Sequence, residues 1–220
     1  LDGLFSHLPN VCWTSNGAIA TDEIDDALEE SRITGKHLEI FSVDKFPKMV
    51  NYIVPNGVRI ADSSRIRLGA YLGDGTTVMH EGFINFNAGT EGPGMVEGRI
   101  SAGVMVGEGS DLGGGCSTMG TLSGGGNIII SVGEECLIGA NAGLGIPLGD
   151  RCTVEAGLFV TAGTKVAVLD DARKIVETVA ARDLAGRSDL LFRRNSLSGS
   201  VECLTNKTAI ELNESLHANN

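Results

Sequence analysis

Few residues of this 220-residue chain combine the types and spacing that could carry out chemistry. Glu97 and Arg99 are two positions apart in the segment MVEGRISAG, Met95 to Gly103. In a β-strand, residues i and i+2 lie on the same face, so the carboxylate and the guanidinium would be presented together. An ordinary surface ion pair explains this spacing equally well. The neighbouring glycine-rich segment favours a functional site.

Histidine chemistry has little support. Of the four histidines only His80 lies in the glycine-rich part of the chain, and one histidine cannot form a three-histidine zinc site. Glu81 beside it could bind a metal if copies of the chain met on a symmetry axis, although a solvated turn carboxylate is the simpler interpretation. The glycine clusters 113–115 and 124–126 could turn backbone N–H groups toward a phosphate or carbonyl oxygen, or could serve only as tight corners.

The part of the chain that must position these residues has a six-residue repeat. An aliphatic residue recurs at Ile60, Ile66, Leu72, Val78, Ile84, Ile100, Val106, Leu112, Val132, Ile138, Leu144, Leu148, Val154, Val160 and Val166. A period of six fits neither an α-helix nor an alternating strand. One short strand and one turn per six residues would place every sixth side chain inside a narrow prism of stacked coils. The sequence therefore predicts an all-β-dominated parallel β-helix over residues 57–166. A glycine-rich β-sandwich is the alternative, but its turns would recur every 8–12 residues.

Two segments interrupt this period, Asn87–Met95 and Met119–Asn127, and both are expected to be loops that project from corners. Residues 1–56 are expected to be the remnant or linker of an N-terminal α/β domain. They should contain a helix from about Asp22 to Arg32, capped by Thr21 and ended by Gly35, followed by one or two strands. Residues 167–220 should form strands, including LLFRRNS, and a short terminal helix in TAIELNESLHANN. We expect these elements to cover the open end of the β-helix.

Composition limits the partners and the compartment. The net charge of -11 argues against nucleic acid as a general partner. No apolar run approaches the roughly 18 residues of a membrane span. The five cysteines are an odd number without a C-x-x-C pair, which indicates a reduced, cytoplasmic protein. The chain begins with Leu1 instead of methionine, so we expect that it is a fragment with a preceding segment.

Several long motifs resemble one enzyme family. They are RIADSSRIRLGAYLGDGTTVMHEGFINFNAGT, MVEGRISAGVMVGEGSDLGGG and MGTLSGGGN in the repeat, VDKFPKM before it, and FRRNSLSG and AIELNESLHAN after it. They are similar to the longer type of tetrahydrodipicolinate N-succinyltransferase, from bacterial lysine and diaminopimelate synthesis. The resemblance implies a left-handed parallel β-helix, a homotrimer with sites between subunits, and succinyl transfer from succinyl-CoA to the amine of ring-opened tetrahydrodipicolinate. A same-fold enzyme with another acyl donor or acceptor, or a non-catalytic β-helix, are the alternatives.

The resemblance also assigns roles to residues. Glu97 matches the catalytic glutamate, which would act as a nucleophile that forms an acyl anhydride or as the base that deprotonates the amine. Gly120 matches a position whose N–H would polarise the thioester carbonyl. The succinyl-CoA contacts carry over to Arg99, Gly114, Ser117, Ala140, Glu155, Ala156, Gly163, Lys174, Arg193, Arg194 and Asn195. Arg99 would hold a carboxylate, and the later basic residues would meet the phosphates of CoA.

A magnesium ion on the trimer axis is implied as well, with Glu81 as the matching ligand. The family's other ligand is an aspartate, whereas Ser64 occupies the aligned position in this chain and Asp62 lies close by in sequence. This departure weakens the expectation of a metal.

Overall fold

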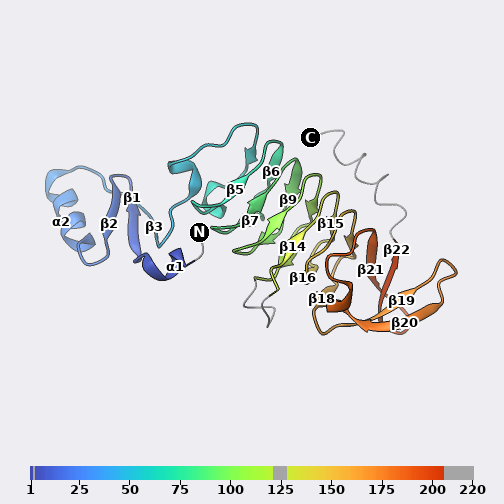
Figure 1. Ribbon diagram of the computed structural model, residues 1–220. Coiled ribbons are helices and arrows are strands. Elements are labelled where there is room, and N and C mark those ends of the chain that lie inside the picture. The colour runs from blue at the N-terminus through green and yellow to red at the C-terminus, as the bar shows by residue number, and fades with distance from the viewer. Residues whose placement is uncertain (2, 121–127, 206–220) are drawn as a thin grey trace.

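The body of the chain is a stack of short parallel strands arranged in three sheets (Figure 1). The computed structural model describes residues 1, 3–120 and 128–205. Successive strands along the chain belong to different sheets, so the backbone hydrogen bonds join one coil to the next. The parallel β-helix predicted from the six-residue period is confirmed.

We number the three faces of the prism in chain order. Face 1 contains β4 (Arg59–Ile60), β6 (Thr76–Val78), β9 (Gly94–Val96), β12 (Asp111–Leu112), β15 (Leu137–Ile138) and β17 (Thr153–Val154). Face 2 contains β7 (Phe83–Ile84), β10 (Arg99–Ile100), β13 (Ser117–Thr118), β16 (Gly143–Gly145) and β18 (Phe159–Thr161). Face 3 contains β5 (Tyr71–Leu72), β8 (Gly89–Thr90), β11 (Met105–Val106) and β14 (Ser131–Val132). A short 3-10 helix, η2 (Ser63–Arg65), lies between β4 and β5.

The core fills the inside of the prism. The recurring aliphatic residues are buried from Ile66 to Val166, and Ile60 at the end of the stack is partly buried against them. Each such side chain stabilises the fold by about 1.5–3 kcal/mol through the apolar surface that it removes from water. The core and the hydrogen-bonded ladder therefore depend on the same stacking.

The first predicted loop does not exist. Residues 87–95 contain β8 and part of β9, and Thr90 occupies an inward position, paired with Leu72 and Val106 of face 3. A polar residue is acceptable there because the Thr90 and Thr76 hydroxyls share a hydrogen bond of 2.8 Å. The prediction of a projecting loop was wrong because a threonine occupies a position where the six-residue repeat otherwise has an aliphatic residue. For the second predicted loop, residues 121–127 lie outside the described residues.

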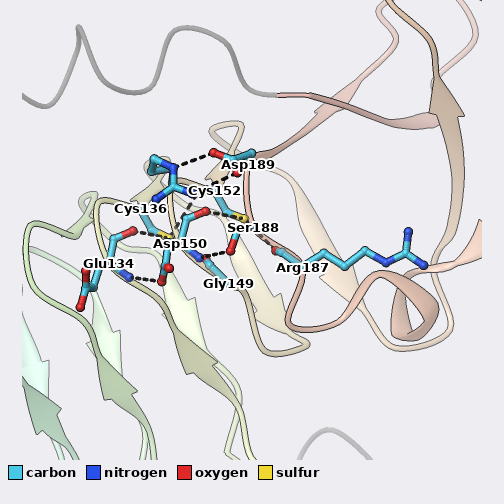
Figure 2. Close-up of polar contacts among 9 residues, drawn as sticks. Glu134, Cys136, Gly149, Asp150, Cys152, Arg187, Ser188 and Asp189 are labelled. Atoms are coloured by element: carbon cyan, nitrogen blue, oxygen red, sulfur yellow. Dashed lines mark hydrogen bonds and ion pairs between the residues drawn. The ribbon is translucent and has the colours of Figure 1, made fainter.

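Polar side chains fasten the coils at the edge between face 3 and face 1 (Figure 2). The Asp150 carboxylate accepts a hydrogen bond from the Glu134 amide at 3.0 Å, and the Asp150 amide donates to the Ser188 hydroxyl at 3.0 Å. Arg151 forms a bidentate pair with Asp189, at 2.6 and 3.0 Å. The polar side chains at this edge therefore have a structural role, which is to hold neighbouring coils together.

A small antiparallel sheet precedes the β-helix. Its strands are β1 (Val11–Thr14), β2 (Gly17–Ala20) and β3 (Ile40–Asp44), in the order β2-β1-β3, accompanied by the helices α1 (Leu4–His7), α2 (Ile24–Thr34) and η1 (Met49–Asn51). Gly35 ends α2 in the left-handed conformation, as predicted. The prediction of Thr21 as N-cap was wrong, because Glu23 is the N-cap and makes no side-chain capping bond.

The last strands extend face 1 beyond β17. They are β19 (Lys165–Leu169), β20 (Ile175–Ala180), β21 (Leu190–Arg194) and β22 (Val201–Thr205), and the 3-10 helix η3 (Ala181–Leu184) lies among them. β21 pairs with β17, and Phe192 and Leu184 are buried in the common core, so these elements cover the open end as predicted. The predicted terminal helix lies outside the described residues. No helix in the described part of the chain is long and apolar enough to cross a membrane.

Candidate functional site

Glu97 lies at the corner between face 1 and face 2, and not inside a strand as the sequence suggested. β9 ends at Val96 and β10 begins at Arg99, because the chain takes only four residues from one inward position, Val96, to the next, Ile100. The Glu97 amide donates to the Leu112 carbonyl at 2.8 Å, which fixes the corner while the side chain stays half-buried. An added Cβ at Gly114 would lie 3.6 Å from Glu97 Oε2, so the carboxylate lies over this glycine.

The surroundings of Glu97 include a buried thiol. Burial raises the pKa of Cys116 to about 12, with a further contribution from the negative charge of Glu97. Cys116 is therefore a neutral thiol at physiological pH and a poor candidate nucleophile. The carboxylate is the group at this corner that can take part in acyl-transfer chemistry.

Arg99 projects from the outer surface of face 2. Its guanidinium donates from Nε and Nη2 to the Ser117 hydroxyl at 3.0 and 2.8 Å. None of the ion pairs among the described residues joins Arg99 to Glu97, so the structure does not support the surface ion pair. The same outward row continues from Phe83 through Arg99 and Ser117 to Gly143 and Phe159.

Three of the predicted contacts stack along the edge between face 1 and face 2. The Gly115 amide donates to the Glu97 carbonyl at 3.3 Å, Asn141 donates to Gly114 at 2.9 Å, and Gly157 donates to Ala140 at 2.8 Å. Gly114, Ala140 and Ala156 thus follow Glu97 on successive coils. Because these side chains are absent or are single methyl groups, the edge offers a smooth path beside Glu97.

The path ends at β21. The Arg194 amide donates to the Glu155 carboxylate at 2.6 Å, which connects the last corner to the Arg193–Asn195 segment. Four coil steps of about 4.8 Å separate Glu97 from Arg194, a span of about 19 Å. The edge is thus long enough for an extended ligand that has a reactive end and a charged end.

The side chains of Arg193 and Asn195 both bind one carboxylate, that of Glu202. Arg193 donates to Glu202 Oε2 at 3.0 and 2.8 Å, and Asn195 donates to Glu202 Oε1 at 2.7 Å. Hydrogen bonds from Asn195 and Arg193 hold the pKa of Glu202 below its usual value. No sequence pattern pointed to Glu202, since its partners face it only across the β21–β22 pair. The exposed Arg194 guanidinium donates to the Gly199 carbonyl at 3.1 Å.

The remaining predicted residues lie elsewhere. Gly120 follows β13 and Gly163 follows β18, so both lie beyond the carboxyl ends of the face 2 strands, across face 2 from Glu97. Lys174 lies in the exposed turn between β19 and β20, where its amide donates to the Asp170 carboxylate at 2.8 Å. A single chain therefore does not bring Gly120 to the corner that holds Glu97.

The described part of the chain contains no group of three histidine, cysteine, aspartate or glutamate side chains suited to a metal ion. The Glu81 backbone carbonyl accepts a hydrogen bond from the Arg65 guanidinium at 2.9 Å, and the Asp62 carboxylate accepts from the Ser64 amide and hydroxyl at 2.9 and 2.7 Å. These bonds hold the pKa of Asp62 below its usual value. The described residues of one chain therefore do not by themselves form a magnesium site.

Comparison with known proteins identifies the relatives of this chain. A family model described as tetrahydrodipicolinate N-succinyltransferase middle matches residues 8–48, and one described as hexapeptide repeat of succinyl-transferase matches residues 129–162. Proteins named 2,3,4,5-tetrahydropyridine-2,6-dicarboxylate N-succinyltransferase are 73% identical in Pseudomonas aeruginosa and 66% identical in Vibrio cholerae, over all 220 residues. The chain is homologous to this family of N-succinyltransferases.

The chain spans 64% of the length of these relatives. A crystal structure from Campylobacter jejuni, named for a 2,3,4,5-tetrahydropyridine-2-carboxylate N-succinyltransferase, superimposes with a TM-score of 0.85 at 42% identity. It covers 96% of this chain, and the match covers 58% of that protein. The predicted left-handed parallel β-helix is confirmed by this likeness and by the hexapeptide-repeat match.

Proposed function

We propose that this chain belongs to an enzyme that transfers a succinyl group from succinyl-CoA to the amine of tetrahydrodipicolinate, in diaminopimelate and lysine synthesis. Tetrahydrodipicolinate is a cyclic imine, so one water molecule must first open its ring to a free amine and a ketone. Transfer of the succinyl group to this amine would then give N-succinyl-2-amino-6-oxopimelate and CoA. The observation that carries this proposal is the identity of 66–73% to proteins named for this reaction over the full length of the chain. The open corner at Glu97, beside a row of small residues, supports it.

The reaction needs one new bond and one proton acceptor. The amine nitrogen forms a bond to the succinyl carbonyl carbon, the thioester C–S bond breaks, and the sulfur leaves as a thiolate that takes up a proton. Glu97 would remove the proton from the amine, or would first attack the thioester and form a mixed anhydride that the amine then opens. Its half-buried carboxylate over Gly114 is compatible with both routes.

The donor would lie along the edge between face 1 and face 2. Arg99 and Ser117 would hold the succinyl carboxylate near Glu97, and the pantetheine arm would pass Gly114, Ala140 and Ala156. Arg194 would meet phosphate at the far end, with Glu155, Arg193 and Asn195 holding its strand in place. Lys174 and Gly163 would act as more distant contacts.

The separation of Gly120 from Glu97 suggests that a complete site needs two copies of the chain. We propose a cytoplasmic homotrimer in which Gly120 of a neighbouring copy supplies the N–H that polarises the thioester carbonyl. A magnesium ion on the trimer axis would need Glu81 as a ligand from each of three copies of the chain. Since one chain offers no such group among its described residues, no step of the reaction is assigned to a metal.

The test is thiol release from succinyl-CoA by the full-length protein, with tetrahydrodipicolinate or 2-aminopimelate as acceptor and acetyl-CoA as control donor. We expect Glu97→Gln to lower kcat at least about 100-fold while the oligomer stays intact, because proton transfer by a positioned base contributes about that much. Glu177→Gln, on the exposed surface of β20, is the matched control and should keep full activity.

Equal turnover by Glu97→Gln and the parent protein would contradict the role of Glu97. Turnover with acetyl-CoA or another amine in place of these substrates would favour a same-fold acyltransferase of different specificity. A folded full-length protein that turns over no acyl donor would favour a non-catalytic β-helix.

A further inference from the structure

The outer surface of face 2 carries a row of residues that starts beside the Glu97 corner. One residue per coil belongs to this row, with about 4.8 Å between coils, in the order Arg99, Ser117, Gly143 and Phe159. The Arg99 guanidinium is hydrogen-bonded to the Ser117 hydroxyl, and none of the ion pairs among the described residues neutralises its charge. The row therefore has a cation that can bind a carboxylate at one end and an aromatic ring at the other.

The strand between these two groups has no outward side chains. Both outward residues of β16 are glycines, Gly143 and Gly145. A Cβ at Gly143 would lie 2.1 Å from Cδ1 of Phe159. A Cβ at Gly145 would lie 2.9 Å from Sδ of Met119. The Phe159 ring and the Met119 thioether therefore occupy the space that outward side chains of β16 would fill.

The Phe159 ring folds back from β18 toward Ser117. Because Ser117 and Gly143 are direct neighbours on successive coils, the ring over Gly143 lies one coil beyond the Ser117 hydroxyl. Phe159 is 56% exposed, so the ring packs on β16 while much of its surface stays free to contact a ligand. The ring forms an apolar wall next to the Arg99–Ser117 pair.

We propose that Phe159 sets the length of the acyl group that the site accepts, because its ring closes the row one coil beyond Ser117. This inference rests on the proposed function, in which the thioester lies at Glu97 and the acyl carboxylate binds Arg99 and Ser117. A succinyl group reaches this pair and stops before the ring. An acyl group with one more methylene must press its carboxylate against the ring or move its thioester away from Glu97, where a misplacement of about 1 Å can cost about 100-fold in rate.

The chemistry of the wall also opposes a longer acyl group. A carboxylate pushed beyond Ser117 would lose charge-assisted hydrogen bonds to Arg99. It would instead meet the Phe159 ring and the Met119 thioether, neither of which can donate a hydrogen bond. An acyl group without a carboxylate would leave Arg99 without a ligand and would not touch the wall. Phe159 therefore discriminates against longer donors, and Arg99 discriminates against donors that lack the carboxylate.

The test measures thiol release from succinyl-CoA, glutaryl-CoA and acetyl-CoA by the full-length protein and by its Phe159→Ala and Phe159→Leu variants, with 2-aminopimelate as acceptor. We expect the parent protein to prefer succinyl-CoA to glutaryl-CoA by about 10–200-fold in kcat/KM, the range that one methylene contributes. Phe159→Ala should reduce this preference about tenfold or more, since it opens the space for that methylene. Phe159→Leu should reduce it less, because leucine fills part of the space. The preference for succinyl-CoA over acetyl-CoA should not change.

The preference compares two donors on the same protein, so a general loss of activity or of folded protein cancels from it. Ile33→Ala, at a 78% exposed apolar residue of α2, is the matched control and should keep the preference of the parent protein. A Phe159→Ala protein with the same preference as the parent would overturn the role of Phe159 and leave the succinyltransferase proposal standing. A parent protein that uses succinyl-CoA and glutaryl-CoA equally well would do the same. A parent protein that releases thiol from none of the donors would overturn both proposals.

Discussion

Replacement of Glu202 by glutamine tests whether the charged end of the proposed donor path is built as the structure indicates. Glu202 faces Arg193 directly across the β21–β22 pair, and its side chain is only 8% exposed. Glutamine keeps an oxygen that can accept from Asn195, but its amide group cannot accept the two Arg193 bonds of 2.8 and 3.0 Å. Each lost bond to a charged group costs about 1.5–3 kcal/mol. Water recovers part of this loss because the Arg193 side chain is 29% exposed, so we expect a net cost of about 2 kcal/mol.

The pH dependence of this effect has a definite sign. The pKa of Glu202 is lowered in the folded protein from its ordinary value of 4.5, so the ionised carboxylate stabilises the fold at pH values above 4.5. This contribution disappears as the pH falls through the folded pKa. The stability difference between the parent protein and Glu202→Gln should therefore be largest at neutral pH and should shrink in acid.

Urea unfolding at one fixed protein concentration, followed by circular dichroism at pH 7 and at about pH 3.5, measures the difference. Glu177→Gln, which alters an exposed glutamate on the adjacent hairpin, should change the free energy of unfolding by no more than about 0.5 kcal/mol. A Glu202→Gln protein as stable as this control at pH 7 would refute the reasoning, and so would an equal loss at both pH values.

Two further predictions concern the interior of the β-helix. Thr90→Val should cost about 1–3 kcal/mol, because the buried Thr76 hydroxyl loses its partner at 2.8 Å, whereas Thr76→Val with Thr90→Val should recover most of that loss. Additive costs in urea unfolding of the single and double variants would contradict this pairing. Burial raises the pKa of Cys116 and of Cys203 to about 12, and all five cysteines are buried and reduced. A thiol reagent at pH 8 should therefore find no reactive cysteine in the native protein and five after denaturation, and rapid labelling of the native protein would show that the core opens.

The coils could be predicted from the sequence because every inward position places the same demand on its side chain. A side chain that enters the prism must be apolar and of moderate size, and residues such as Val78 and Ile138 meet this demand at a fixed spacing. The prediction failed where another physical solution was available. Thr90 enters the core with a hydrogen-bonded partner, and the tight corner at Glu97 shortens the spacing by two residues. A count of aliphatic residues at six-residue spacing therefore registers both positions as breaks in the repeat.

The site was harder to predict because it depends on contacts between coils and between strands. The small residues Gly114, Ala140 and Ala156 are far apart in sequence, and only the stacking of coils places them in one row with Glu97. The Arg193–Glu202 pair depends on the register of two antiparallel strands, which no period in the sequence encodes.

The scaffold itself explains why chemistry belongs at this edge. Within the sheets, the backbone N–H and C=O groups are used by the neighbouring coils, and the inward side chains are packed against one another. Reactive groups are therefore confined to the corners and to the outward rows. At the edge between face 3 and face 1, polar side chains fasten one coil to the next (Figure 2). The edge between face 1 and face 2 instead carries the small residues Gly114, Ala140 and Ala156, the half-buried Glu97 carboxylate, and Arg194 at its far end. Such an arrangement suits the proposed long anionic acyl donor, which would reach from Arg194 to Glu97.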